Sequence, residues 1–328
     1  MCIRDRWNTL HTPGGSSSGA AVAVAEKETT VSFASDTVGS IRIPASFCGV
    51  FGFMSSLGSI PRGRRSGFVL GSAGGLGHSV DDVYALLSTV CRSSVNDGST
   101  FRTGWEPTVS KSQNRIKDIK IAWKSNFHWL EVDTEIQSQV YNLVSSLKDI
   151  GFNLSECEFD LRMDNKLPAA RTIMLTGFKH WLQRLDVVNK ANKIESVKKS
   201  HPVVDKTMNS EYWNSSAVDL DRALSSMYQI KSQLARVFQT VDLLLLPTTP
   251  FTAPKLEDCD FKDNLAKFAS LVWWTNWAGC PSASFPFGKS SNGMPIGLQL
   301  IAAPRNDHLI FDVCRVIEKQ FPWKRPGD

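Results

Sequence analysis

Two clusters of small and hydroxyl-bearing residues are the part of this 328-residue chain best suited to chemistry. Residues 12–19 read Thr-Pro-Gly-Gly-Ser-Ser-Ser-Gly and contain Ser16, and residues 33–45 contain Ser40 within Asp-Thr-Val-Gly-Ser-Ile-Arg. A serine hydroxyl becomes a nucleophile when a neighbouring group removes its proton, and amide hydrolysis also needs donors directed at the developing oxyanion. A tight turn of small residues before a serine can supply backbone N–H groups for that purpose.

The chain between the clusters has the lengths needed to bring them together. A helix over residues 19–26 would run about 12 Å, and a strand over residues 30–34 would return roughly 16 Å. If the chain reverses at residues 27–29, both clusters end on the same side of the layer. We therefore predict that the hydroxyls of Ser16 and Ser40 meet there.

The rest of the chain alternates between strand and helix patterns. Ser79 to Asp82 form a capping box before an amphipathic helix, and Gly151 ends another helix. Further strands are expected at residues 119–123, 153–157, 242–246, 282–286 and 296–302, and helices at 136–150, 169–192, 218–240 and 308–320. This alternation predicts an α/β fold with a mixed, largely parallel sheet covered by helices on both faces.

Composition narrows the functional classes. Hydrophobic residues make up 42% of the chain, which is enough for a large core, and no apolar run approaches a membrane span. The net charge of +5 is spread thinly, and the lysine-rich residues 190–199 are interpreted as a solvated surface, so no nucleic-acid partner is expected. Cysteine and histidine spacing predicts neither a metal site nor a cofactor. The widely spaced cysteines favour a cytoplasmic location, and the sequence leaves an organellar location open.

The two clusters resemble the amidase signature family, whose hallmark is a Gly-Gly-Ser-Ser loop followed by a Gly-Ser-Asp-Thr-Gly-Gly-Ser-Ile-Arg turn. The resemblance continues at residues 47–53, 244–250, 278–283 and 295–300. The residues of these motifs are most similar to those of the plant-type branch, which contains indole-3-acetamide amidohydrolases and amidase-like chloroplast import receptors. It implies an α/β/α sandwich and hydrolysis of a small amide, such as an arylacetamide, through an acyl-enzyme.

The resemblance also assigns roles to individual residues. Ser40 corresponds to the nucleophile, and Ser16, on a cis peptide bond, corresponds to the serine that links it to a neutral lysine base. The N–H groups of Thr37, Val38 and Gly39, with that of Ser40 itself, correspond to the oxyanion hole.

Three further residues are expected to support this site. Asp36 and Arg42 flank the turn and would fix it through charged hydrogen bonds, and Ser17 follows the bridging serine.

Cys48 lies in an apolar run and is interpreted as a buried structural thiol. The cluster of Trp273, Trp274 and Trp277 is interpreted as core packing in preference to an acyl pocket.

Two departures from the family pattern carry consequences. Only fifteen residues precede Ser16 and none is lysine, so we expect the chain as printed to lack the triad base and to hydrolyse amides negligibly. We interpret residues 1–6 as a non-native leader and residues 7–328 as a partial amidase signature domain. Val38 stands where the hydrolases usually carry glycine, and a β-branched residue would distort the turn if that position required a positive φ.

The sequence leaves two other functions open. One is the glutaminase component of a tRNA-dependent amidotransferase, which would need partner subunits. The other is a non-catalytic scaffold of the import-receptor type built on the same fold. A small-molecule amide is the partner expected for an amidase, and a homo-oligomer also stays open.

Overall fold

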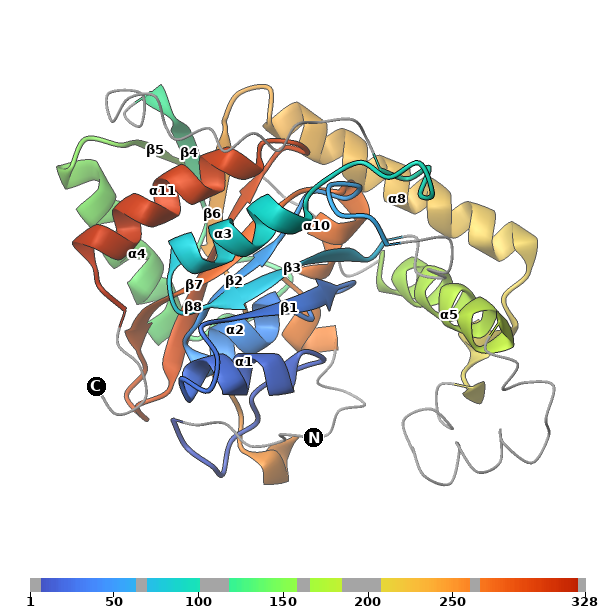
Figure 1. The fold of residues 1–328 in the computed structure, drawn as a ribbon, viewed down its shortest axis with the longest axis horizontal. Helices are drawn as coiled ribbons and strands as arrows, with labels where there is room; N and C mark the ends of the chain where they lie inside the picture. Colours follow the sequence, from blue (N-terminus) through green and yellow to red (C-terminus); the bar gives the residue numbers. More distant parts are fainter. Residues whose placement is uncertain are drawn as a thin grey trace.

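The computed structural model describes residues 7–62, 70–100, 118–157, 166–184, 208–259 and 266–323. Within them, eight strands form one sheet in the order β1-β3-β2-β7-β8-β6-β4-β5 (Figure 1). The strands are β1 (Val31–Asp36), β2 (Phe51–Met54), β3 (Ser72–Gly77), β4 (Lys120–Trp123), β5 (Asn153–Glu156), β6 (Leu243–Pro247), β7 (Ser282–Lys289) and β8 (Pro295–Ala302). The helices are α1 (Ser18–Ala25), α2 (Arg42–Cys48), α3 (Val80–Val90), α4 (Thr134–Asp149), α5 (Leu167–Arg184), α8 (Ala217–Val237), α10 (Trp273–Ala278) and α11 (Asp307–Gln320), with short 3-10 turns at Glu211–Asn214 and Leu256–Asp258.

The sheet is mixed, as predicted, but the expectation that it is largely parallel is wrong. Among the described strands only the β4–β5 and β4–β6 pairs are parallel, and the other pairs are antiparallel. Strands β1 and β2 run in the same direction but are not neighbours, because β3 lies between them and pairs antiparallel with both. The alternation of strand and helix in the sequence does not reveal this pairing.

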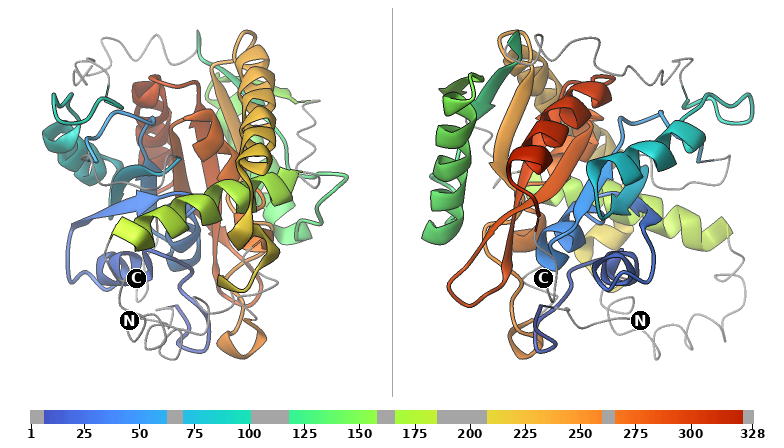
Figure 2. Two further views of the ribbon diagram at one scale, coloured as in Figure 1. Left: turned by 90° about the vertical axis from the view of Figure 1, so that its right-hand side faces the viewer. Right: turned by 60° about the vertical axis from the view of Figure 1, so that its left-hand side comes forward.

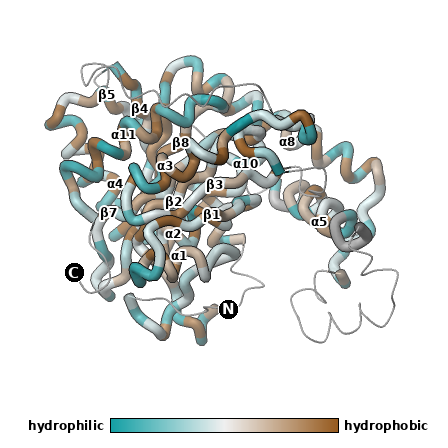
Figure 3. The backbone as a smooth tube through the Cα atoms, viewed as in Figure 1, coloured by the Kyte–Doolittle hydropathy of each residue, from teal (hydrophilic) through white to brown (hydrophobic). Residues whose placement is uncertain are grey.

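Helices cover both faces of the sheet, which confirms the predicted layering. Strand β6 shows the division residue by residue, because Leu243 and Leu245 pack in one core cluster with α3, α4 and α11. Leu244 and Leu246 point the other way and pack with α2, α5, α8 and α10. Figure 2 shows α11, α3 and α4 on one side of the strands, and in Figure 3 the central strands are mostly coloured as hydrophobic.

Most predicted elements appear within a few residues of their expected bounds, including the capping box, in which Ser79 Oγ accepts from Asp82 N at 3.1 Å. Strand β3 was not predicted because its sequence, Ser-Ala-Gly-Gly-Leu-Gly, lacks strand formers. Gly74 explains this composition, since a Cβ there would lie 1.9 Å from the carbonyl oxygen of Phe53 on β2. The glycines allow the strands to approach closely.

Several interpretations of the sequence fall outside the described residues: the leader at residues 1–6, the lysine-rich residues 190–199 and the end of the helix predicted to reach residue 192. Among the helices that the structure describes, none is both long and apolar enough to cross a bilayer.

Candidate active site

The Gly/Ser loop and the turn that carries Ser40 lie side by side. The chain reverses after α1 where Lys27 takes a positive φ of 63°, and β1 then returns toward the loop. The amide of Ser17 donates a hydrogen bond to the carbonyl of Ser40 at 3.2 Å. The predicted approach of the two clusters is thus confirmed at the level of the backbone.

The geometry of the loop matches the resemblance at Ser16. The Gly15–Ser16 peptide bond is cis, as expected. Ser16 is exposed, and Ser40 is half-buried. Ser16 therefore lies at the protein surface, and Ser40 is partly accessible to solvent.

The segment that follows β6 anchors this loop. Residues 253–254, after β6, accept hydrogen bonds from its start: His11 Nδ1 lies 2.6 Å from the carbonyl oxygen of Ala253, and Thr12 N donates to Pro254 O at 3.0 Å. Gly14 has a φ of 76° and sits against Phe47, where a Cβ would come within 3.1 Å of the ring. The carbonyl groups that do this anchoring carry no side-chain signal, so the sequence could not reveal them.

Asp36 shapes the turn from inside. Its carboxylate accepts hydrogen bonds from the amides of Gly39 at 2.7 Å and Ile41 at 3.0 Å, and from Arg42 Nε at 3.0 Å. The side chains of Asp36 and Arg42 form an ion pair at 3.0 Å and are fully buried. The predicted charged hydrogen bonds are confirmed, and they close the backbone around the residues that precede Ser40.

Helix α10 completes the polar cluster. Arg42 Nη1 donates to Val272 O at 2.9 Å and to Thr275 Oγ1 at 2.6 Å, and Arg42 Nη2 donates to Asn276 Oδ1 at 2.7 Å. Asn276 Nδ2 in turn donates to Asp36 Oδ1 at 3.0 Å. Asn276 was missed in the sequence, where the available signal was one amide side chain within an otherwise aromatic, apolar stretch.

The electrostatics of this cluster favour an ionised Asp36. Burial by itself would raise the pKa of the carboxyl group. The charge of Arg42 and the hydrogen bonds from Arg42, Asn276 and Ile41 outweigh burial, so the pKa of Asp36 lies below its ordinary value of 3.8. The carboxylate therefore holds the turn at neutral pH.

The backbone of the turn resolves the question raised by Val38. Gly39 takes the positive φ, 111°, and a Cβ there would lie 2.4 Å from Val272 Cγ2. Among the described non-glycine residues, only Lys27 and Arg305 have a positive φ. Val38 therefore avoids the left-handed region, and the distortion that valine could have caused does not arise.

The N–H groups of the turn divide into two sets. The amide of Gly39 is directed at Asp36, which differs from its predicted place among the oxyanion donors. The amides of Thr37, Val38 and Ser40 have no acceptor within the described part of the chain. These three N–H groups therefore remain without a protein acceptor in the described residues next to Ser40.

Other candidate groups have structural roles. Cys48 is buried, and its thiol donates to Pro13 O at 3.6 Å. Trp273, Trp274 and Trp277 are at most 3% exposed, which confirms core packing. No cluster of metal-ligating side chains occurs among the residues described.

Removing the charge of Asp36 should destabilise the protein strongly. Asp36→Asn leaves the Arg42 guanidinium buried without its counter-charge, a change that typically costs about 3–5 kcal/mol of unfolding free energy. The exposed pair between Asp81 and Arg315 provides a matched control, because Asp81→Asn should cost at most about 1 kcal/mol. Urea unfolding at neutral pH measures both values. A loss below about 1 kcal/mol for Asp36→Asn would contradict this role.

The same ion pair should give the protein an acid-sensitive component of stability. Because the pKa of Asp36 is lowered by folding, its contribution is complete above about pH 4 and is lost as the pH falls through the folded pKa. The stability difference between the wild type and Asp36→Asn should therefore shrink between about pH 7 and about pH 3. Asp307, whose pKa burial raises, is common to both proteins and cancels in that difference. A difference independent of pH would refute the assignment.

Comparisons with known proteins show which family the chain resembles. A sequence model described as "Amidase" matches residues 4–311. A glutamyl-tRNA(Gln) amidotransferase component from Lachnoclostridium phytofermentans is 28% identical, with 98% of this chain and 70% of that protein aligned. The corresponding protein of Thermosynechococcus vestitus is 29% identical, with 97% and 70% aligned.

Solved structures share the fold. A bacterial aryl acylamidase superposes with a TM-score of 0.84 at 21% identity, over 98% of this chain and 68% of that one. A 6-aminohexanoate cyclic dimer hydrolase with bound substrate gives 0.80 at 23% identity, over 99% and 72%. None of these relatives singles out the plant-type branch, which stays a prediction. With the motif-bearing loop, the buried turn and a family match over most of its length, the chain belongs to the amidase family.

Proposed function

We propose that this chain is the core of a serine amidohydrolase in which Ser40 attacks a small amide. The observation that carries the proposal is the turn held by Asp36, which leaves three N–H groups unpaired around a half-buried serine. Next to it, the Ser17–Ser40 backbone contact holds the loop that carries Ser16. A nucleophile, a bridging hydroxyl and oxyanion donors are three of the parts that acyl transfer from an amide needs, and a base is the fourth.

Each residue takes one role in the proposed reaction. Ser40 Oγ would bond to the amide carbon while Ser16 accepts the Ser40 proton and relays it toward a base, which the family resemblance assigns to a lysine. The carbonyl oxygen would take up negative charge opposite the N–H groups of Thr37, Val38 and Ser40, and loss of one such donor typically costs about 10²–10³ in rate. The C–N bond then breaks, the protonated amine leaves, and water hydrolyses the acyl-enzyme.

An activated ester tests the nucleophile separately from the base. Its good leaving group lowers the demand on proton removal, so p-nitrophenyl phenylacetate should acylate Ser40 even where amides turn over negligibly. Intact-mass measurement should show one phenylacetyl group on the wild type and on Ser35→Ala, which removes an exposed serine near the end of β1. Ser40→Ala should show none, and Ser16→Ala should be acylated at least about tenfold more slowly.

An adduct of equal yield on Ser40→Ala would place the reactive residue elsewhere and overturn the proposal. If the wild type remains unmodified at concentrations that acylate other serine hydrolases, the non-catalytic scaffold becomes the better explanation.

A second candidate substrate is the side-chain amide of glutamine. The observation that favours it is the name of the relatives from Lachnoclostridium and Thermosynechococcus, both components of a glutamyl-tRNA(Gln) amidotransferase. In this alternative Ser40 is acylated by a glutamyl group, and ammonia passes to a partner protein. The same Ser40 chemistry serves both candidates, so the substrate distinguishes them.

Ammonia release separates the two substrates. The glutaminase hypothesis predicts that the chain forms ammonia from glutamine only after the other components of a tRNA-dependent amidotransferase are added, and that Ser40→Ala abolishes this. Glutamine that remains intact with all components present, beside phenylacetyl transfer to Ser40, would support the arylacetamide-type hypothesis alone.

A further inference from the structure

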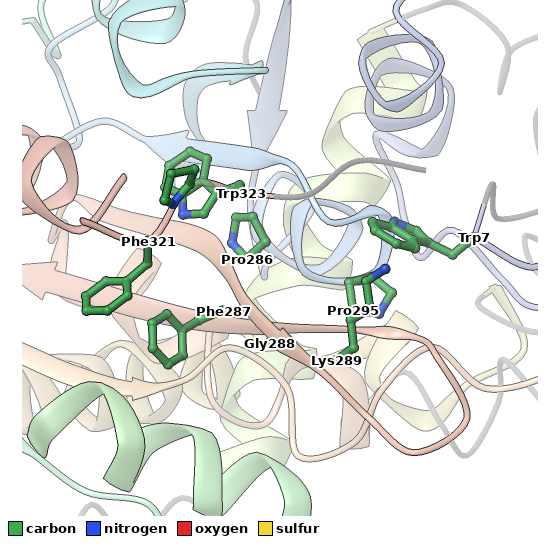
Figure 4. A pocket seen from close by; sticks show the side chains of 9 residues that line it. Trp7, Pro286, Phe287, Gly288, Lys289, Pro295, Phe321 and Trp323 are labelled. Atoms are coloured by element: carbon green, nitrogen blue, oxygen red, sulfur yellow. The ribbon is translucent and has the colours of Figure 1, made fainter. Parts of the chain in front are cut away.

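A groove away from the candidate active site is lined by aromatic and proline side chains. It has a volume of about 340 Å³, which lies within the usual range for small-molecule sites. It runs along the ends of β7 and β8, and its walls include Trp7, Phe287, Pro295 and Trp323 (Figure 4). We call this site the aromatic groove. None of the residues assigned to the proposed reaction lines it.

The walls of the aromatic groove are fixed to the protein core. Trp7 Nε1 donates to Cys48 O at 3.0 Å. Phe287 meets Phe321 edge-on with ring centroids 5.5 Å apart, and Trp323 stacks on the buried Phe51 at 5.6 Å. These contacts hold the walls in place without an occupant, so a flat apolar ligand would find a surface that is already formed.

Lys289 supplies the charge of the aromatic groove. Its ammonium lies 3.9 Å from the centroid of the Trp7 ring, and it is the one charged side chain in the lining. In the part of the chain that the structure describes, no carboxylate pairs with it. A positive charge is therefore held at one end of an apolar surface and can receive an anion.

Trp323 adds a second polar feature toward the other end, as Figure 4 shows. Its indole N–H is buried and has no acceptor among the described residues. Because this N–H is buried, it faces the protein and not the open groove, and Lys289 alone can recognise an anion there. The lining thus offers one cation and no acidic side chain.

We propose that the aromatic groove binds a small aromatic carboxylate. The ring of the ligand lies against Phe287 and Pro295, and its carboxylate pairs with Lys289. The apolar walls favour a flat hydrocarbon body, and the single cation selects an anion over a neutral compound of the same shape. This site is independent of the reaction proposed for Ser40.

Calorimetric titration with 2-naphthoate tests the proposal, with 2-naphthalenemethanol as the uncharged probe of similar shape. The wild type should bind 2-naphthoate at least about tenfold more tightly than the alcohol, because charge-assisted hydrogen bonds contribute that much. Lys289→Met keeps the apolar side-chain length and should weaken naphthoate binding about tenfold, whereas Lys289→Arg should stay within about threefold. Since Lys289 is exposed, thermal unfolding should show both variants intact.

The salt dependence adds a second readout. Binding of 2-naphthoate should weaken when sodium chloride rises from about 50 to about 500 mM, and binding of the alcohol should not. Absence of binding up to about 5 mM 2-naphthoate would overturn the proposal. Unchanged affinity in Lys289→Met would overturn it as well, because the ligand would then occupy another site, such as the surface next to Ser40.

Discussion

The buried ion pair between Asp36 and Arg42 is the interaction on which the candidate active site depends. Two charges removed from water are costly unless their remaining hydrogen-bonding groups are satisfied. Here the amides of Gly39 and Ile41, in the turn itself, donate hydrogen bonds to Asp36. Asn276, on α10, bonds to both members of the ion pair. The turn is therefore folded around the ion pair, and its shape is coupled to the packing of α10, which lies 234 residues further along the chain at the contact between Arg42 and Asn276.

This coupling gives the neighbouring residues distinct physical tasks. Gly39 adopts a positive φ and lies so close to Val272 that a side chain would not fit. Its N–H donates a hydrogen bond to Asp36. Thr37 and Val38 are thereby freed to direct their N–H groups elsewhere. The turn therefore needs the conformational freedom of glycine only at residue 39. Residue 38 can carry a side chain, and that of Val38 packs against the core.

The sequence was sufficient to predict the local features of the site. The lengths of α1 and β1 placed Ser16 and Ser40 on one side, and the charges of Asp36 and Arg42 indicated that they fix the turn. The sequence could not predict the long-range contacts. The contacts of the carbonyl groups of residues 253–254 depend on where the chain after β6 packs, and those of Asn276 depend on where α10 packs. The prediction of a largely parallel sheet failed for the same reason: the alternation of strand and helix does not show which strands pair, and β3, which was not predicted, lies between β1 and β2 and pairs antiparallel with both.

A crystal structure with phenethylboronic acid would test most directly whether folding brings the hydroxyl oxygens of Ser16 and Ser40 together beside free N–H groups. Boronic acids form tetrahedral adducts that imitate the intermediate of acyl transfer. We expect boron bonded to Ser40 Oγ, one boronate oxygen about 3 Å from the amides of Thr37 or Val38, and Ser16 Oγ within hydrogen-bonding distance of Ser40 Oγ. Boron bound to another residue, or a Ser16 hydroxyl directed away from Ser40, would contradict the proposed chemistry.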